Sequence, residues 1–350
     1  MTRSFGLFAV VAACGARTGL DVIAARDATV YGVDSAEGTE ADVSDSGVHP
    51  VACGSARVIA SQAIQGSGYI DQLVVRGTDI YFSAGGVWHT SVGGITELLG
   101  ATHSGWPLYS AFDIDPTTIY WASGVNETDV DASYVMYAPR DGGAASLMGT
   151  IAAPFFSQVG ATDGGVFVWS YQYPCDIDIV GVDASVAALT QLFTAPARLI
   201  ATSSGAYLGS TDGLFAWDGR SSLAMLSPIG VADFTIDGDS IVFTEAANGA
   251  TAVSVWRIPI GEQDAAQAVP LVNAYSLFLG GVAVDDASVY FCDRVVQTVV
   301  RVTKTSGQVS VVATDDEGGQ IIDVALDDAC VYWTAADLGG GTNRVSVTSK

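Results

Sequence analysis

Asp286-Ala287-Ser288-Val289-Tyr290-Phe291 and Asp328-Ala329-Cys330-Val331-Tyr332-Trp333 are two copies of one phrase, a polar turn followed by an apolar run rich in β-branched and aromatic residues. Weaker copies begin their apolar runs at Ile80, Ile119, Val166, Ala206 and Ile241. The seven copies recur at intervals of about 35 to 48 residues, which is near the period of four-stranded propeller blades. The recurrence therefore predicts an all-β fold, a seven-bladed β-propeller.

Each repeat unit divides into four short segments with strand-forming composition. The first unit has them at residues 72–76, 80–83, 87–90 and 95–99, separated by turns that contain Gly. The last unit offers only residues 321–326, 330–334 and 344–348, so its sheet would have an unpaired edge. We expect residues 57–61, which precede the first unit, to supply the missing strand and close the ring. The span 57–350 allows about 42 residues for each of seven blades, which favours seven over the alternative of six.

The composition suits a folded all-β body. Apolar residues make up 49% of the chain, charged residues 15%, and there are 40 glycines, so both core and turn material are abundant. The formal net charge of −24 argues against nucleic acid or an anionic membrane surface as a partner, because like charges repel. Many of the acids stand in the repeated turns, where Asp caps its own backbone, and we interpret these as structural.

The N-terminal residues have the pattern of an export signal. Arg3 is followed by an apolar segment up to Ala13, and Val11-Ala12-Ala13-Cys14-Gly15 resembles the lipobox of bacterial lipoproteins, in which the Cys is lipidated. The segment is too short to span a bilayer. Residues 14–52 are acidic and poor in large apolar side chains, as in a solvated tether. We therefore expect a signal at 1–13, a flexible tether at 14–52 and a propeller domain at 53–350.

Three stretches resemble the repeats of YWTD and NHL-type propellers and of bacterial secreted lipoproteins with repeated VYWT phrases. They are Tyr120-Trp121-Ala122-Ser123, Tyr290-Phe291-Cys292-Asp293 and Tyr332-Trp333-Thr334-Ala335. YWTD propellers usually have six blades, so a count of seven departs from that family. The aromatic pair of the motif fills the space between neighbouring blades, so the resemblance implies a fold rather than an activity.

Four cysteines besides Cys14 allow three full pairings. Strand direction alternates within a blade, so Cys330 at the start of one strand and Cys53 just before the closing strand fall at the same end of the last blade. We expect a Cys53–Cys330 disulfide that locks the ring. Cys175 and Cys292 belong to distant blades and are expected to be free. The absence of a CxxC pair argues against a zinc site, and we predict neither a metal nor a cofactor.

The sequence offers little for catalysis. It contains three histidines and no GxSxG, Walker or HExxH pattern. We expect His89 and His103 to be surface or packing residues, because a general base needs an oriented partner. The alternative is a propeller enzyme of the lyase or lactonase kind, for which His103 with Asp113 or Asp176 are the candidates.

Aromatic residues in the loops give the better functional signal. In a propeller, the connection from the fourth strand of one unit to the first strand of the next lies on the same face as the connection from the second to the third strand within a unit. That face would collect the candidate binding residues Tyr69, Trp106, Tyr109, Phe155, Tyr171, Tyr173 and Tyr275. Exposed aromatic rings among charges suit a protein or glycan surface. The alternative interpretation is that several of the rings plug the central channel or cover blade ends. We expect a non-enzymatic, monomeric binding module that holds a protein or polysaccharide partner at the cell envelope. We also expect it to be exported as an outer-membrane lipoprotein that faces the periplasm or the cell surface and touches the membrane only through its lipid.

Overall fold

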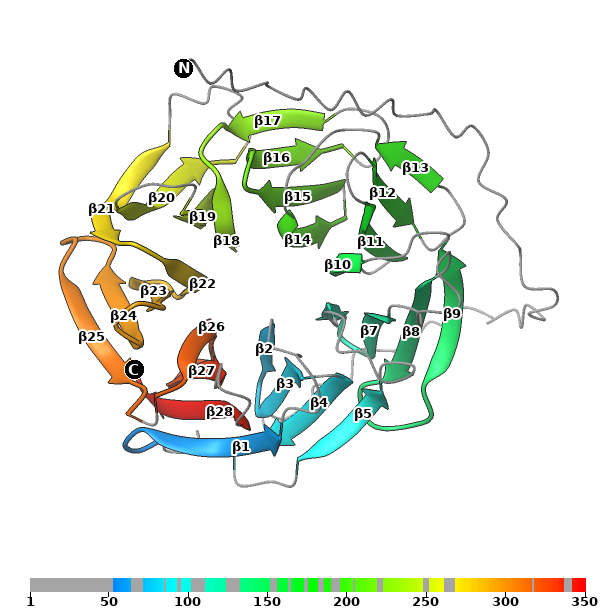
Figure 1. Ribbon diagram of the computed structural model, residues 1–350, viewed down its shortest axis with the longest axis horizontal. Helices are drawn as coiled ribbons and strands as arrows, with labels where there is room; N and C mark the ends of the chain where they lie inside the picture. Colours follow the sequence, from blue (N-terminus) through cyan, green and yellow to red (C-terminus); the bar gives the residue numbers. More distant parts are fainter. Residues whose placement is uncertain are drawn as a thin grey trace, which may run out of the picture.

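The computed structural model describes residues 53–63, 72–84, 86–92, 96–101, 111–123, 133–151, 156–162, 165–172, 176–181, 186–189, 196–203, 205–218, 223–247, 252–260, 268–316, 318–336 and 342–350. In this part of the chain the strands pair into seven four-stranded antiparallel sheets. The sheets stand around a central axis as the blades of a propeller (Figure 1). The all-β propeller predicted from the repeats is confirmed, and the strand pairing gives seven sheets rather than six. The expected signal and tether lie outside the described residues.

The blades are numbered in chain order, and their strands are called a to d from the axis outward. Blade 1 has β2 (Leu73–Arg76), β3 (Asp79–Ser83), β4 (Gly86–Ser91) and β5 (Glu97–Ala101). Blade 2 has β6 (Phe112–Ile114), β7 (Thr118–Ser123), β8 (Ser133–Pro139) and β9 (Ser146–Ile151). Blade 3 has β10 (Phe156–Thr162), β11 (Gly165–Gln172), β12 (Asp176–Gly181) and β13 (Val186–Leu189). Blade 4 has β14 (Pro196–Thr202), β15 (Gly205–Ser210), β16 (Gly213–Trp217) and β17 (Leu223–Ser227).

The remaining three blades follow the same order. Blade 5 has β18 (Val231–Asp237), β19 (Ser240–Glu245), β20 (Val253–Pro259) and β21 (Val269–Ser276). Blade 6 has β22 (Leu279–Val284), β23 (Ser288–Asp293), β24 (Thr298–Thr303) and β25 (Val309–Thr314). Blade 7 has β26 (Gln320–Leu326), β27 (Cys330–Ala336) and β28 (Thr342–Ser349), with β1 (Arg57–Ala63) as its outermost strand.

The N-terminal strand closes the ring. β1 pairs antiparallel with β28, with Arg57 opposite Val347 and Ala63 opposite Thr342. A disulfide joins Cys53 to Cys330, whose Cα atoms are 5.9 Å apart, across a sequence separation of 277 residues. Both features were predicted from the incomplete last unit, and both are confirmed. They fasten the two ends of the described chain into one blade, so the edge of that sheet is covered.

The hydrophobic core is divided among the seams between blades. The buried apolar residues fall into seven clusters in the described chain, and each cluster takes its members from two neighbouring blades. Tyr81 and Trp121, for example, are fully buried in the cluster that joins blades 1 and 2. This confirms that the repeated aromatic residues of strand b fill the space between blades. The described residues include no helix with the length and apolar character needed to span a bilayer.

A repeated hydrogen-bond pattern explains the Asp that precedes the apolar run. In three blades one carboxylate oxygen of this Asp accepts two backbone N–H groups of its own turn, and the other accepts the hydroxyl of the Tyr five residues later. We call these residues the turn aspartates: Asp115 with Tyr120, Asp285 with Tyr290, and Asp327 with Tyr332. Asp285 and Asp327 are among the acids of the repeated turns that we interpret as structural from the sequence, and for these two the interpretation is confirmed.

Candidate functional site

The connections from strand d to the next strand a, and from strand b to strand c, lie on one face of the disc, called here the loop face. Most of the aromatic residues proposed for this face fall outside the described residues, namely Tyr69, Trp106, Tyr109, Phe155 and Tyr173. Tyr171 lies in β11, where only the backbone is described. The assignment of these residues to a binding site stays a prediction.

Tyr275 lies near the end of β21 and packs inward. Its ring meets Phe291 edge to face with 5.3 Å between ring centroids, and it belongs to the half-buried rim of the core between blades 5 and 6. Burial, with a further contribution from Asp293, raises the pKa of the Tyr275 hydroxyl. A large part of this side chain therefore serves packing, and its replacement would disturb the fold as well as the surface.

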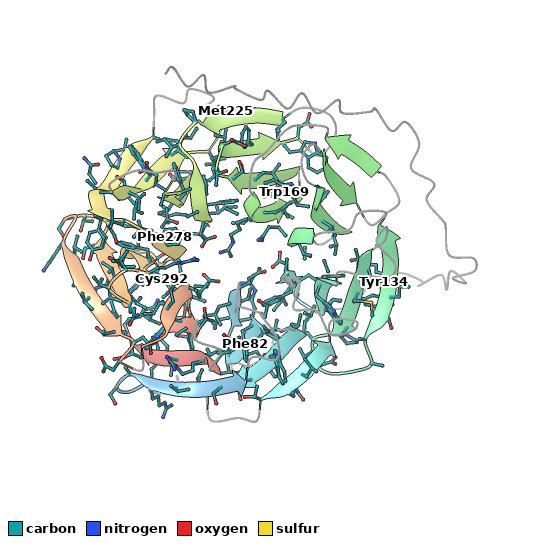
Figure 2. All side chains as sticks on the ribbon, in the orientation of Figure 1. Phe82, Tyr134, Trp169, Met225, Phe278 and Cys292 are labelled. Atoms are coloured by element: carbon teal, nitrogen blue, oxygen red, sulfur yellow. A yellow bond between two sulfur atoms is a disulfide. The ribbon has the colours of Figure 1, made fainter. Side chains whose placement is uncertain are left out.

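Four large apolar side chains are exposed next to this position. Leu277 and Phe278 come from the connection between blades 5 and 6, and Val295 and Val296 from the b-to-c turn of blade 6. Their exposed fractions are 54%, 43%, 51% and 57%. We call this group the blade 6 patch, and Figure 2 labels its member Phe278.

The two loops of the blade 6 patch are tied to each other. One carboxylate oxygen of Asp293 accepts the backbone N–H of Val295 at 2.9 Å and of Val296 at 3.3 Å, and also the Ser276 hydroxyl at 2.9 Å. The backbone N–H of Arg294 donates to the Phe278 carbonyl at 3.1 Å, and its guanidinium carbon lies 5.3 Å from the centroid of the Phe278 ring. The apolar side chains are thus presented on an ordered support, with one cation beside an aromatic ring.

A second group of polar side chains surrounds the axis of the propeller. Four residues in or next to strand a bridge to the next blade. Each accepts a backbone N–H: Gln72 from Phe112 at 3.1 Å, Asp113 from Ala161 at 2.8 Å, Asp233 from Val282 at 2.8 Å and Asp323 from Leu73 at 2.8 Å. We call Asp113, Asp233 and Asp323 the channel aspartates. Their hydrogen bonds join blades 2 to 3, 5 to 6 and 7 to 1.

Arg198 of blade 4 supplies the positive charge for this group. Its Nη1 lies 3.0 and 3.2 Å from the two carboxylate oxygens of Asp233, and the two side chains are 22% and 11% exposed. Burial would lower the pKa of Arg198, but the carboxylates of Asp233, Asp323 and Asp113 outweigh it and raise that pKa. The guanidinium therefore stays charged among three acids.

Burial raises the pKa of two of the channel aspartates, Asp323 and Asp113. Burial, reinforced by the charge of Asp233, raises the pKa of Asp323 to about 7 even though Arg198 opposes the change. Burial also raises the pKa of Asp113, against its hydrogen bonds from Ala161 and Ile114 and the charges of Arg198 and Arg76. A carboxyl whose pKa lies near neutral pH is the kind of group used for proton transfer, so this group is the candidate among the described residues for the enzyme alternative.

Sequence reasoning did not find the Arg198 group or the valines of the blade 6 patch, but a signal for the first was present. Arg198, Asp233 and Asp323 each stand eight positions before the apolar run of their unit, which begins at Ala206, Ile241 and Val331. Aligning the units on the apolar run would have shown charged residues recurring at one inward-facing position of strand a. The exposure of Val295 and Val296 has no such signal, because it depends on the loops around them.

The cysteines and histidines add little chemistry. Cys292 is free and buried, as predicted, and burial raises the pKa of its thiol, with Asp323 contributing. Cys175 lies outside the described residues. His89 sits between Asp79 at 3.1 Å and Glu97 at 2.9 Å and stacks on Tyr81, which is a packing arrangement.

The enzyme alternative depends on residues that are only partly described. His103 lies outside the described residues and the side chain of Asp176 is not described, so the proposed His103 arrangements cannot be placed. Within the described ranges no three side chains among His, Cys, Asp and Glu are grouped closely enough to hold a metal ion.

Comparison with known proteins identifies the fold and nothing finer. Neither a protein-family model nor a curated protein sequence matches this chain. Among solved structures, a catalytically inactive virginiamycin B lyase from Staphylococcus aureus with quinupristin is similar over 83% of this chain and 99% of its own, with a TM-score of 0.61 at 9% identity. A chain of the mitotic checkpoint complex is similar over 93% and 99%, with a TM-score of 0.61 at 11% identity.

A third similar structure also indicates a β-propeller fold. The WD40 domain of Neurospora crassa Pan2 is similar over 84% of this chain and 96% of its own, with a TM-score of 0.56 at 10% identity. Identities this low establish a β-propeller, the class that binding domains share with a lyase, and they do not select an activity.

Proposed function

We propose that this chain is a non-enzymatic binding module, exported and held at the cell envelope by a lipid on Cys14, which binds a protein or polysaccharide partner through its loop face. The observation that carries the proposal is the blade 6 patch. Leu277, Phe278, Val295 and Val296 expose between 43% and 57% of their surface on two loops that Asp293 holds in place. Exposed apolar side chains gathered on two joined loops are typical of an interaction surface.

The chemistry of the patch favours a polypeptide over a glycan as its direct ligand. Aromatic residues and Arg are enriched at protein interfaces, and Phe278 with Arg294 above it is such a pair. The chain carries a formal net charge of −24, which attracts a basic partner and repels an acidic one. We therefore expect a partner surface with apolar side chains surrounded by basic ones.

Partner capture from the cell envelope with matched variants tests the proposal. The double variant Val295→Asp/Val296→Asp places two charges on the blade 6 patch. The control Val309→Asp/Val311→Asp places the same charges on β25, where the two valines are 40% and 58% exposed but lie on the outer strand of the same blade. Both variants must first show the wild-type melting temperature.

We expect the crosslinked partner to be lost with the patch variant and kept with the control. Equal recovery from all three proteins would refute a loop-face site at blade 6. Tyr275→Ala is not a suitable probe, because Tyr275 packs on Phe291 and its loss would lower stability.

Membrane attachment is tested separately. Cys14→Ser should move the full-length protein from the membrane fraction to the soluble fraction and abolish incorporation of labelled fatty acid. Retention of the label in the variant would exclude Cys14 as the lipidation site.

A second candidate function is a propeller enzyme, and one observation favours it. Asp323, with a pKa of about 7, lies near Arg198 in the axial group, so a proton-transfer residue and a fixed cation share one region. Screening lactones and elimination substrates with wild type and Asp323→Asn tests this candidate, and activity present only in the wild type would establish it. We also expect a chelator to leave the melting temperature unchanged, and a fall of several degrees would favour a metal-dependent enzyme.

A further inference from the structure

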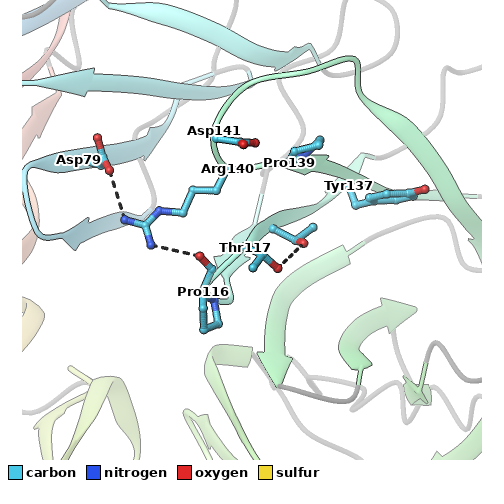
Figure 3. Close-up of a pocket in the computed structure, with 8 residues that line it drawn as sticks. Asp79, Pro116, Thr117, Tyr137, Pro139, Arg140 and Asp141 are labelled. Atoms are coloured by element: carbon cyan, nitrogen blue, oxygen red, sulfur yellow. Dashed lines mark hydrogen bonds and ion pairs between the residues drawn. The ribbon is translucent and has the colours of Figure 1, made fainter. Parts of the chain in front are cut away.

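A pocket of about 550 Å³ opens on the face opposite the loop face, between blades 1 and 2. Its walls come from the a-to-b turn of blade 2 at residues 116–118, the c-to-d turn at residues 139–141, and Tyr137 of β8 (Figure 3). The volume lies within the range of about 300–1,000 Å³ usual for small-molecule sites.

Hydrogen bonds from the Arg140 side chain join the residues at the floor of the pocket. Arg140 donates to the Tyr81 hydroxyl at 3.2 Å, to the Arg76 carbonyl at 3.2 Å and to a carboxylate oxygen of Asp79 at 3.2 Å. It also reaches the Pro116 carbonyl at 3.5 Å. One side chain thus fastens the turns of two blades together, and the site exists before any ligand arrives.

The turn that forms the second wall is fixed from within. Asp115 accepts the backbone N–H of Thr117 at 2.7 Å and of Thr118 at 2.6 Å. The hydroxyls of the two threonines lie 3.1 Å apart, which Figure 3 marks with a dashed line. The Thr117 hydroxyl also donates to Asp115 at 3.1 Å, so the Thr118 hydroxyl donates to Thr117, and the two oxygens remain as neighbouring acceptors at a defined position.

Two further groups are available to a ligand. Tyr137 is 36% exposed and lines the pocket. Asp141 is exposed on the c-to-d turn, and no hydrogen bond or ion pair engages its carboxylate within the part of the chain that the structure describes. The pocket thus combines an aromatic wall, two hydroxyls and an open carboxylate acceptor.

The charge balance narrows the class of ligand. Arg140 is paired with Asp79, so this cation and this anion offset each other. Asp141 is then the unpaired charge among the described lining residues, so the pocket is negative and disfavours an anion. A neutral ligand with one apolar face and several hydroxyls satisfies all the groups together.

We propose that this pocket binds one pyranose unit of a neutral saccharide. The apolar face of the sugar ring lies on Tyr137, and adjacent sugar hydroxyls donate to the Asp141 carboxylate and to the hydroxyl oxygens of Thr117 and Thr118. The site is independent of the blade 6 patch, which lies on the other face. The propeller would then carry a glycan contact and a protein contact on opposite sides.

Saturation-transfer NMR and calorimetry on the wild-type protein test the proposal with three probes: methyl α-D-mannopyranoside, methyl β-D-glucopyranoside and N-acetylglucosamine. We expect at least one probe to bind. Tyr137→Phe should preserve binding, because the ring face is kept, whereas Tyr137→Ala should weaken it by at least about fivefold. Asp141→Asn should also weaken it. Asp239→Asn, on the same face but in blade 5 and 93% exposed, is the matched control and should bind like wild type.

Three outcomes would overturn the proposal. The first is no binding of any probe to the wild-type protein. The second is binding that Tyr137→Ala and Asp141→Asn leave unchanged, which would place the sugar elsewhere. The third is displacement of the probes by tetramethylammonium or L-arginine, which would make the pocket a cation site. The variant Val295→Asp/Val296→Asp should bind the probes normally, so failure of this site and failure of the loop-face proposal are distinguishable.

Discussion

The turn aspartates and the channel aspartates are the same residue type at two distances from the axis of the propeller. The pKa is lowered in two of the turn aspartates and raised in two of the channel aspartates. Asp115 is surrounded by donors, and the hydrogen bonds from Thr117, Tyr120 and Thr118 outweigh burial and lower its pKa. The pKa of Asp285 is lowered too, by Lys350 and by the N–H groups of Ala287 and Ser288. Asp323, which also accepts two backbone N–H groups, has its pKa raised to about 7.

The difference lies in burial and in neighbouring charge. Burial opposes ionisation of Asp115 and Asp285, but they are only partly buried, and their hydrogen-bond donors outweigh it. Asp323 is buried and faces the carboxylate of Asp233, and the single guanidinium of Arg198 is shared among the three channel aspartates. The turn aspartates fix turns within their own blades. The channel aspartates join neighbouring blades and place three carboxyl groups near one guanidinium at the axis.

Removal of Arg198 should have the largest effect. Arg198→Ala leaves Asp233 without its ion-pair partner and removes the cation that also faces Asp113 and Asp323. We expect the free energy of unfolding to fall by about 3 kcal/mol, the lower end of the range for breaking a buried pair, because part of the Arg198 side chain meets solvent. Urea denaturation at pH 8 measures it.

The matched control is Arg257→Ala. Arg257 forms a longer ion pair, 3.7 Å, with Asp239, whose side chain is 93% exposed, so its loss should cost about 0.5 kcal/mol or less. The double variant Arg198→Ala/Asp233→Ala should recover part of the loss, because the carboxylate facing the missing guanidinium is removed with it. Equal costs for Arg198 and Arg257 would show that the axial charges are not under strain.

The pH dependence of stability should separate the two groups next. The folded-state pKa of Asp323, about 7, lies above the usual value for Asp, so the folded protein binds the extra proton. Asp323 therefore contributes stability below about pH 4 that is lost as the pH rises toward 7, with a slope of at most about 1.4 kcal/mol per pH unit. The lowered pKa values of Asp115 and Asp285 act oppositely, since their contribution is present above about pH 4 and lost as the pH falls through the folded-state pKa.

Melting temperatures recorded from pH 3 to pH 9 test this contrast. Asp323→Asn should flatten the decline between pH 4 and pH 7, and Asp285→Asn should weaken the loss below pH 4. Asp328→Asn, an exposed neighbour in the same kind of turn, should leave the whole profile unchanged. A decline that persists in Asp323→Asn would assign it to another group.

Truncation of a turn aspartate should have a moderate effect. Asp327→Ala removes the acceptor of the Ala329 and Cys330 N–H groups, at 2.8 and 2.6 Å, and of the Tyr332 hydroxyl. We expect a cost of about 1–3 kcal/mol, because donors are left unsatisfied near the disulfide. Asp328→Ala is the matched control and should stay within about 0.5 kcal/mol of wild type in denaturant unfolding. A cost that does not exceed that of the control would mean that the turn forms without its cap.

The part of this structure that the sequence predicts is the part that repeats. The apolar runs at Ile80 and Val331 predict strand b, and the missing strand of the last unit predicts β1, because a sheet edge must be covered. The Cys53–Cys330 disulfide follows from the alternating strand direction, which places both cysteines at one end of the last blade. The axial group and the blade 6 patch depend on how different units meet. Taken alone, Asp233 gives no indication of its ion-pair partner, because Arg198 comes from the neighbouring blade. Val295 is an apolar residue of the kind that forms cores, and its exposure depends on the course of its loop.

The smallest effect should come from the tyrosine hydroxyls, and it can grade the turn aspartates among themselves. Tyr332 donates to Asp327 at 2.7 Å, whereas Tyr290 donates to Asp285 at 3.3 Å, a longer and weaker bond. We expect Tyr332→Phe to cost about 1 kcal/mol and Tyr290→Phe clearly less, because Asp285 also has Lys350 as a partner at 3.0 Å. Tyr207→Phe is the control, since the described chain shows no hydrogen bond from the Tyr207 hydroxyl. Equal costs for all three in denaturant unfolding would mean that the Asp–Tyr bond contributes nothing, and that the two backbone N–H groups alone account for the repeated aspartate.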